Sequence, residues 1–391
     1  MEQRLDAEAL IVGAGIVGLS IAVELSSVLR QVVVIERRSS FGLETSSRSS
    51  EVIHAGLYYE PGSAKARHCV EGASLTLERC ERRGVPIARR GKLVVAMTPE
   101  QEERLHALHA NAEACGARDL SLWSRRRLTR ESPWIEATAA IFSPWTTVVD
   151  SHELTRSVAV EAASQGVDLA YRHRLVALEP CGDRWDAEIV DPDGEVLTAR
   201  TPIVVNAAGL GSDAVAAMAG LDVEALGYRL SPCKGDYFAL SGRASRGLDR
   251  LIYPLPDPDL RSLGVHLTID VAGQARLGPD VSYLDPRPTL GADERELDYR
   301  VDEGKLKAFL GAGKRLLPWL DADDLSPERS GIRPKLNGPG EPPRDFVIRH
   351  EADLGRPGLL DLIGIESPGL TAAPSIARAV VDILKRDGLL G

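Results

Sequence analysis

Three side chains that could take part in catalysis or anion binding lie in unusual surroundings in this 391-residue sequence. His54 lies in VIHAG and His266 in GVHLT, each between apolar and small residues, and Arg333 precedes a proline in SGIRPKL. A histidine in such a setting either has a specific partner in the core or faces a cavity, where it can accept a proton near neutral pH. An arginine there can hold a carboxylate with two hydrogen bonds, or form a surface salt bridge. From the residues alone, both interpretations stay open.

The first 36 residues predict the element that holds a cofactor near such side chains. A short strand (8–12), a glycine turn, a helix (16–28) and a second strand (31–35) follow one another, and Glu36 is placed to accept hydrogen bonds from a ribose. The turn has the spacing GxGxxG, which permits a tight turn, close approach of a pyrophosphate and close helix–strand packing. The helix N-terminus offers free amides to the phosphates. We assign to this dinucleotide site Gly13, Ala14, Gly15, Ile16, Val17, Gly18, Glu36 and Arg37.

Later segments favour FAD over NAD as the dinucleotide. VVNAAGLGSDAVA (204–216) is an apolar strand that runs into small residues, where a backbone passes close to a ligand. GIESPGLTAAPSIA (364–377) predicts a strand, a turn and a helix whose N-terminus can face the flavin N1–C2=O edge. The polar loop after Glu36 can reach the pyrophosphate with hydroxyl and amide groups. The cofactor residues predicted in these segments are Thr45, Ser46, Ser47, Arg48, Ala207, Ala208, Gly209, Gly364, Ile365, Gly369, Leu370 and Thr371.

The order of these segments predicts an α/β protein in which the nucleotide domain is discontinuous. We expect a Rossmann-like FAD-binding domain from residues 1–85, 151–225 and 340–391. Residues 86–150 and 226–339 would form an inserted α+β substrate domain on a mostly antiparallel sheet. An ordinary NAD domain would instead use one continuous series of βα units.

Composition excludes several classes of protein. The 47 basic and 57 acidic residues give a net charge of −10, which argues against nucleic acid or an anionic membrane as partner but not against a small anionic substrate. Five scattered cysteines without a CxxC pair predict neither a metal site nor a disulfide framework, and favour a reducing, cytoplasmic location. No apolar run reaches the roughly 20 residues that span a bilayer. Peripheral contact with a membrane stays open.

Motifs in collinear order along nearly the whole chain carry a family resemblance. They include VGAGIVGL, SSEVIHAGLYYEPGSAKARHC, RRGKLVVA, VVNAAGLGSD, KGDYF, SGIRPKL and GIESPGLT. The chain resembles the D-amino-acid-oxidase/glycerol-3-phosphate-dehydrogenase superfamily of FAD enzymes, and within it the L-2-hydroxyglutarate dehydrogenase/oxidase group. The resemblance implies non-covalent FAD and oxidation of a 2-hydroxy acid, best L-2-hydroxyglutarate, to the 2-oxo acid. The segment LSPCK before Gly235 departs from the aromatic or arginine-bearing stretch expected there, which leaves the exact substrate open.

The resemblance also implies roles for the residues of the substrate side. An alcohol needs a base for its hydroxyl proton, so His54 or His266 would be that base while the other orients substrate or flavin. Arg333 would clamp the carboxylate, and Lys335 could meet a second one. Tyr59 and Tyr253 would contact substrate or flavin, or only pack in the core, and Val176 would lie against the adenine.

Other activities remain as alternatives. A sibling enzyme would act on glycerol 3-phosphate or on an amine such as an amino acid, and a flavoprotein without its own turnover would bind FAD tightly and not be reduced by small substrates. The electron acceptor could be oxygen, a quinone or a protein, and the sequence does not choose between them.

Overall fold

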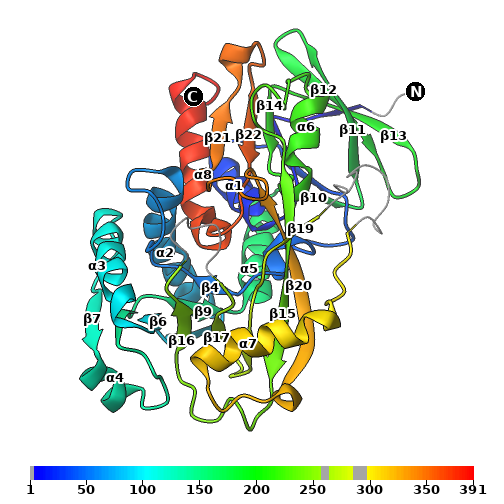
Figure 1. Cartoon of the computed structure of the whole chain (residues 1–391). Coiled ribbons are helices and arrows are strands. Elements are labelled where there is room, and N and C mark those ends of the chain that lie inside the picture. Colours follow the sequence, from blue (N-terminus) through cyan, green and yellow to red (C-terminus); the bar gives the residue numbers. More distant parts are fainter. Residues whose placement is uncertain (1–3, 257–263, 285–296) are drawn as a thin grey trace.

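A six-stranded sheet carries the glycine-rich turn, in a computed structural model that describes residues 4–256, 264–284 and 297–391 (Figure 1). Its strand order is β10-β3-β2-β14-β22-β21, and every neighbouring pair is parallel except the last. The strands come from three separated parts of the chain: β2 (Ala9–Val12), β3 (Val32–Glu36), β10 (Asp168–Tyr171), β14 (Ile203–Asn206), β21 (Val347–His350) and β22 (Leu359–Ile363).

Both faces of the central strands of this sheet are buried, which explains why β2, β3, β14 and β22 are mostly apolar. Along β2, Ala9 and Ile11 belong to one core cluster, while Leu10 and Val12 belong to a second cluster on the opposite face. This is the two-residue alternation of a strand. Four helices cover the first face: α1 (Ile16–Ser26), α2 (Ala64–Arg83), α5 (Ser151–Ser164) and α8 (Gly369–Arg386). On the second face lie α6 (Ser212–Met218) and a sheet of β1 (Arg4–Asp6), β11 (Arg174–Cys181), β12 (Arg184–Val190) and β13 (Val196–Thr201).

A larger, mostly antiparallel sheet forms the other part of the molecule, and the predicted fold class is confirmed. Only its β6–β16 pair is parallel among the described strands. The strands are β6 (Lys92–Ala96), β7 (Ser121–Ser124), β8 (Ala139–Ser143), β15 (Ser231–Leu240), β16 (Leu251–Pro254), β17 (Leu267–Ile269), β18 (Ala275–Leu277), β19 (Ser282–Tyr283) and β20 (Leu325–Lys335). Side chains of α4 (Arg125–Glu131) and α7 (Leu306–Leu316) pack in one core cluster of this part, and those of α3 (Pro99–Ala114) pack in another.

The long antiparallel pair β15 and β20 and the helix α7 come from the segment 226–339, the second part of the predicted substrate domain. Prolines at 232, 327 and 334 disguise the two strands, because proline is depleted from strand interiors.

The stretch EVIHAGLYY links the two parts of the molecule. Only Val52–Ile53 form a strand, β4, which pairs with β9 (Thr147–Val149), and β9 pairs in turn with β5 (Ile87–Ala88). Glu51, just before β4, is tied to the larger sheet by ion pairs to Arg276 and Arg329. The residues just before His54 are therefore held both by the pairing of β4 with β9 and by the ion pairs of Glu51. Within the described residues, no helix has the length and apolar character needed to cross a membrane.

Candidate active site

A cavity of about 570 Å³ runs from the glycine turn of α1 to the larger sheet. Most of the residues that the sequence assigned to cofactor and substrate line it. These are Gly13, Gly15, Ile16, Val17, Glu36, Arg37, Thr45, Ser46, Arg48, His54, Tyr59, Ala207, Ala208, Gly209, Tyr253, His266, Arg333, Lys335, Ile365, Gly369, Leu370 and Thr371. The assigned residues that are not on its wall are Ala14, Gly18, Ser47, Val176 and Gly364.

The glycine turn is as close-packed as its spacing predicts. Gly13 has φ +108°, and a Cβ there would lie 2.5 Å from the carbonyl oxygen of Ala207. A Cβ on Gly18 would lie 2.1 Å from the carbonyl oxygen of Gly13, so Gly18 packs α1 against the turn and does not face the cavity. Glu36 accepts hydrogen bonds from the backbone amides of Ala14 (2.9 Å) and Arg38 (2.8 Å), and burial raises its pKa.

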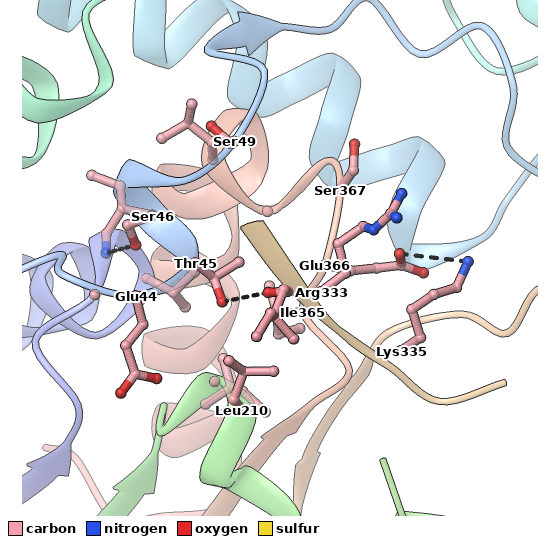
Figure 2. A pocket seen from close by; sticks show the side chains of 18 of the residues that line it. Glu44, Thr45, Ser46, Ser49, Leu210, Arg333, Lys335, Ile365, Glu366 and Ser367 are labelled. Atoms are coloured by element: carbon pink, nitrogen blue, oxygen red, sulfur yellow. Dashed lines mark hydrogen bonds and ion pairs between the residues drawn. The ribbon is translucent and has the colours of Figure 1, made fainter. Parts of the chain in front are cut away.

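The loop after β3 lies directly on strand β20. Ser46 Oγ accepts a hydrogen bond from the Ile16 amide (3.0 Å), and Thr45 Oγ1 donates one to the carbonyl of Ile332 (3.2 Å), both drawn in Figure 2. A Cβ on Gly331 would lie 2.0 Å from the carbonyl oxygen of Arg48. Only glycine at this position lets the loop approach so closely, one residue from Ile332.

A buried polar network shapes the turn after β14. The Asn206 side chain donates to the carbonyl of Ser212 and to Asp361 Oδ1, both at 2.7 Å, and accepts from the amide of Ala208 (3.4 Å). Burial and the nearby Glu351 together raise the pKa of Asp361 to about 7, against the lowering effect of the hydrogen bond from Asn206. This network fixes the residues 207–209 at the cavity wall.

Val176, predicted to contact adenine, is not among the residues that line the cavity and lies at a β-bulge. The register between β11 and β12 shifts between Leu175 and Ala177, so Val176 has no partner in the ladder. The cavity is lined there by His173, Arg174 and Leu175.

His54 reaches the cavity with one ring nitrogen still free. Its backbone amide donates to Thr371 Oγ1 (3.0 Å), and its Nε2 lies 3.4 Å from Ser367 Oγ. Its Nδ1 is buried and has no hydrogen-bond partner among the described residues. Burial, with smaller effects of Lys92 and His266, holds its pKa well below the usual value, so the ring is neutral near pH 7.

His266 has a defined tautomer. Its Nδ1 lies 2.9 Å from the carbonyl oxygen of Gly264, and since a carbonyl only accepts, Nδ1 carries the hydrogen. Its Nε2 is therefore an acceptor, and this atom is buried without a partner in the described part of the chain. The ring stacks on Tyr253 with centroids 3.8 Å apart, and burial lowers its pKa to about 3. The imidazole is thus neutral near pH 7, and its Nε2 has a free lone pair.

Arg333 is held by backbone carbonyls, not by a carboxylate. Its Nε donates to Cys233 O (3.3 Å), and its Nη2 donates to Lys234 O (3.2 Å) and Asp280 O (2.7 Å). Neutral carbonyls orient the guanidinium without cancelling its charge, and Nη1 makes no hydrogen bond to a described residue. The arginine can therefore bind an anion in the cavity.

A second cationic group lies beside Arg333 around one buried acid, Glu366. Lys65 Nζ lies 3.0 Å from Glu366 Oε1, and Lys335 Nζ lies 3.9 Å from Glu366 Oε2, the pair marked in Figure 2. Burial would raise the pKa of Glu366, but the two lysines and Arg333 outweigh it and hold the pKa below its usual value. Three cations thus share one carboxylate at this wall of the cavity.

Sequence reasoning missed four residues at or near this site: Tyr58, Lys65, Glu366 and Lys92. Tyr58, Lys65 and Glu366 line the cavity, and Lys92 lies behind it in β6. All four lie inside motifs that carried the family resemblance. The signal that could have found Lys92 is a lysine at the head of the apolar run in GKLVVA, where a charge needs a reason to be buried.

Comparison with known proteins identifies the family. A family model described as FAD dependent oxidoreductase matches residues 8–383. The chain belongs to this family. It is 33% identical to the mitochondrial L-2-hydroxyglutarate dehydrogenase of Arabidopsis thaliana, over 97% of this chain and 83% of that protein. It is 29% identical to the L-2-hydroxyglutarate dehydrogenase of Escherichia coli K12, over 95% of this chain and 91% of that protein. The resemblance predicted from the motifs is confirmed.

A solved structure shows the same fold with its cofactor. The L-alpha-glycerophosphate oxidase of Mycoplasma pneumoniae, dithionite-reduced with FAD bound, superimposes with a TM-score of 0.84 at 24% identity, covering 97% of this chain and 95% of that one. FAD is the cofactor of this family, and the residues here fit it. The N-cap residues of α1 and α8 make no side-chain cap, and apart from the amides of Ile16, which donates to Ser46, and Gly369, which donates to the carbonyl of Glu366, the amides of the first turns can face a ligand. Glu36 would hold the ribose, the turn 13–18 the pyrophosphate, and residues 207–209 and 369–371 the flavin.

Proposed function

We propose that this FAD-dependent oxidoreductase oxidises L-2-hydroxyglutarate to 2-oxoglutarate, with a histidine as base. One observation carries the proposal: the cavity brings together an arginine whose hydrogen bonds go to backbone carbonyls and two neutral histidines, each with an unpartnered ring nitrogen. A 2-hydroxy acid needs these two functions, an anion clamp and a proton acceptor. The relatives named L-2-hydroxyglutarate dehydrogenase support the choice of substrate.

Arg333 would bind the carboxylate next to the reacting carbon. His266 Nε2, whose lone pair is fixed by the Nδ1 hydrogen bond to Gly264, would take the proton of the substrate hydroxyl. His54 would orient the substrate through its free Nδ1. When bound, FAD supplies the acceptor of the Cα hydride at flavin N5. The O–H bond would give its proton to His266, the Cα–H bond would give its hydride to that acceptor, and a C=O bond would form.

Lys335 and Lys65 support a dicarboxylate as substrate. They share the carboxylate of Glu366 and, with Arg333, leave two positive charges in excess within this group. The two carboxylates of a dicarboxylate substrate would together neutralise that excess. A monocarboxylate would leave one of the two positive charges unbalanced.

Anaerobic reduction of the FAD-loaded protein tests the proposal. We expect L-2-hydroxyglutarate to bleach the flavin absorbance near stoichiometrically, and L-lactate and D-2-hydroxyglutarate to do so far more slowly. Glycerol 3-phosphate, sarcosine and D-amino acids complete the panel, because members of this fold act on related compounds. Bleaching by one of these and not by L-2-hydroxyglutarate would replace the proposed substrate.

A further inference from the structure

Lys92 is a completely buried lysine for which the described residues provide no anion. It begins β6 and lies between two neighbouring strands, opposite Leu251 of β16 and Ser143 of β8. Its exposed fraction is 0%, and its Nζ forms no hydrogen bond or ion pair with any described residue. Burial of an unpaired ammonium group costs several kcal/mol of stability, so a functional reason for this lysine has to be sought.

Aromatic rings provide the contacts that Lys92 does have. Its Nζ lies 4.6 Å from the ring centroid of Tyr58 and 4.6 Å from that of Tyr253, a cation–π arrangement with both. Both tyrosines line the cavity, and Tyr253 stacks directly on His266 at 3.8 Å. Lys92 is therefore one ring away from the proposed base.

The polar groups around Lys92 are titratable but not anionic at neutral pH. They come from each element packed against it: Cys69 on α2, His54 and Tyr58 after β4, Tyr253 on β16 and His266 before β17. Burial raises the pKa of Cys69 to about 12 and raises those of both tyrosines, so these groups stay neutral. Besides Lys92, the charge that acts on His266 is that of Arg333.

We propose that Lys92 is a positioning residue for the oxidation, whose buried charge keeps His54 and His266 in the neutral, proton-accepting form. This role rests on the proposed function, in which a histidine takes the substrate proton. A positive charge close to an imidazole in a region of low dielectric opposes its protonation. The same charge would add to the field that attracts an anionic substrate.

The direction in which the pKa values of His54 and His266 depart from that of an ordinary histidine agrees with this role. Lys92 contributes to the lowered pKa of both histidines, after burial. Burial also lowers the pKa of Lys92 itself to about 7. The lysine is therefore increasingly charged below pH 7, in the range where an ordinary histidine would become protonated.

Histidine titration by NMR tests the proposal without any substrate. The FAD-loaded protein is labelled at histidine Cε1, and the signals of His54 and His266 are assigned with the variants H54N and H266N. In the wild type we expect both signals to remain those of neutral rings down to about pH 5.5. The titration is continued to the lowest pH at which the protein stays folded, and in K92M, or in K92Q if K92M does not fold, the signal of at least one ring should begin to move towards the protonated form about one pH unit higher than in the wild type. K92R, which keeps the charge, should resemble the wild type.

Two further measurements separate this role from simple packing. K92M should melt at the same temperature as the wild type or higher, because it removes an unpaired buried charge, whereas loss of a packing residue would lower the melting temperature. The acid limb of the kcat/KM profile should move up by about one pH unit in K92M. K314M, a change at a half-exposed lysine on α7, serves as the control and should not move it.

Unchanged histidine titration in the neutral variants would overturn the proposal, as would an equal shift in K92R and K92M. If L-2-hydroxyglutarate does not reduce the flavin, the proposed substrate fails while the NMR result still decides the role of Lys92.

Discussion

Replacement of Asp361 by asparagine should make the protein more stable at alkaline pH. The Asp361 carboxyl is fully buried, accepts a hydrogen bond from Asn206 (2.7 Å) and shares its environment with Glu351. Its pKa in the folded protein is about 7, against 3.8 for an ordinary aspartate. Between these values the folded protein keeps a proton that the unfolded chain has lost. Stability contributed by this proton is complete below pH 4 and is lost as the pH rises through 7.

The size of the effect follows from the raised pKa of Asp361. The folded pKa lies about 1.5 pH units above pH 5.5, and each pH unit corresponds to about 1.4 kcal/mol of stability. The wild type should therefore lose about 2 kcal/mol relative to D361N between pH 5.5 and pH 8. For a chain of 391 residues this is a difference of about 2–3 °C in melting temperature. Asparagine keeps the acceptor for Asn206 and cannot ionise.

Thermal melts followed by flavin fluorescence, at one scan rate and in excess FAD, measure this difference. The melting temperatures of wild type and D361N are compared at pH 5.5, 6.5, 7.5 and 8. D193N, in the exposed turn between β12 and β13, is the matched control and should follow the wild type. A constant offset between D361N and the wild type across this range would refute the reasoning, because it would mean that Asp361 does not titrate there.

Three further substitutions test the site. R333K should lower kcat/KM for L-2-hydroxyglutarate about 100-fold, mainly through KM, because an ammonium cannot reproduce the fork held by three carbonyls; steady-state kinetics with an artificial electron acceptor decide this. H266N should lower the rate of anaerobic flavin reduction by about 10²–10⁴-fold and H54N by less, and the reverse order would make His54 the base. G331A should weaken FAD retention about 10- to 100-fold, since its Cβ would lie 2.0 Å from the Arg48 carbonyl oxygen; the flavin-to-protein absorbance ratio after gel filtration measures it, and full retention would contradict the close approach.

The parts of the fold that local patterns specify were predicted closely from the sequence. The strand predicted at 8–12 is β2 (Ala9–Val12), and the helix predicted at 16–28 is α1 (Ile16–Ser26). Here the glycine spacing and the apolar run both act over a few residues, so the sequence contains the whole signal. Strand β14 (IVVN) is likewise mostly apolar, which is why the sequence indicated an apolar strand from residue 204.

Features that depend on tertiary packing escaped prediction. The β-bulge at Val176 arises from pairing with β12, and no local pattern encodes it. The burial of Lys92 follows from the two tyrosines that cover it, which come from segments 34 and 161 positions away along the chain. Lys65 and Lys335 meet only because both reach Glu366. Such arrangements require the assembled fold.

The contact between the loop 45–48 and strand β20 has a thermodynamic consequence. Thr45 donates a hydrogen bond to the carbonyl of Ile332, and Arg48 packs on Gly331, so the loop that would receive the pyrophosphate is in direct contact with the strand that carries Arg333. Any order that FAD imposes on the loop is therefore transmitted to the substrate clamp. By thermodynamic reciprocity, an anion bound at Arg333 would raise the affinity for FAD by the same factor by which FAD raises the affinity for the anion. The protein would then lose its cofactor most readily when its substrate is scarce.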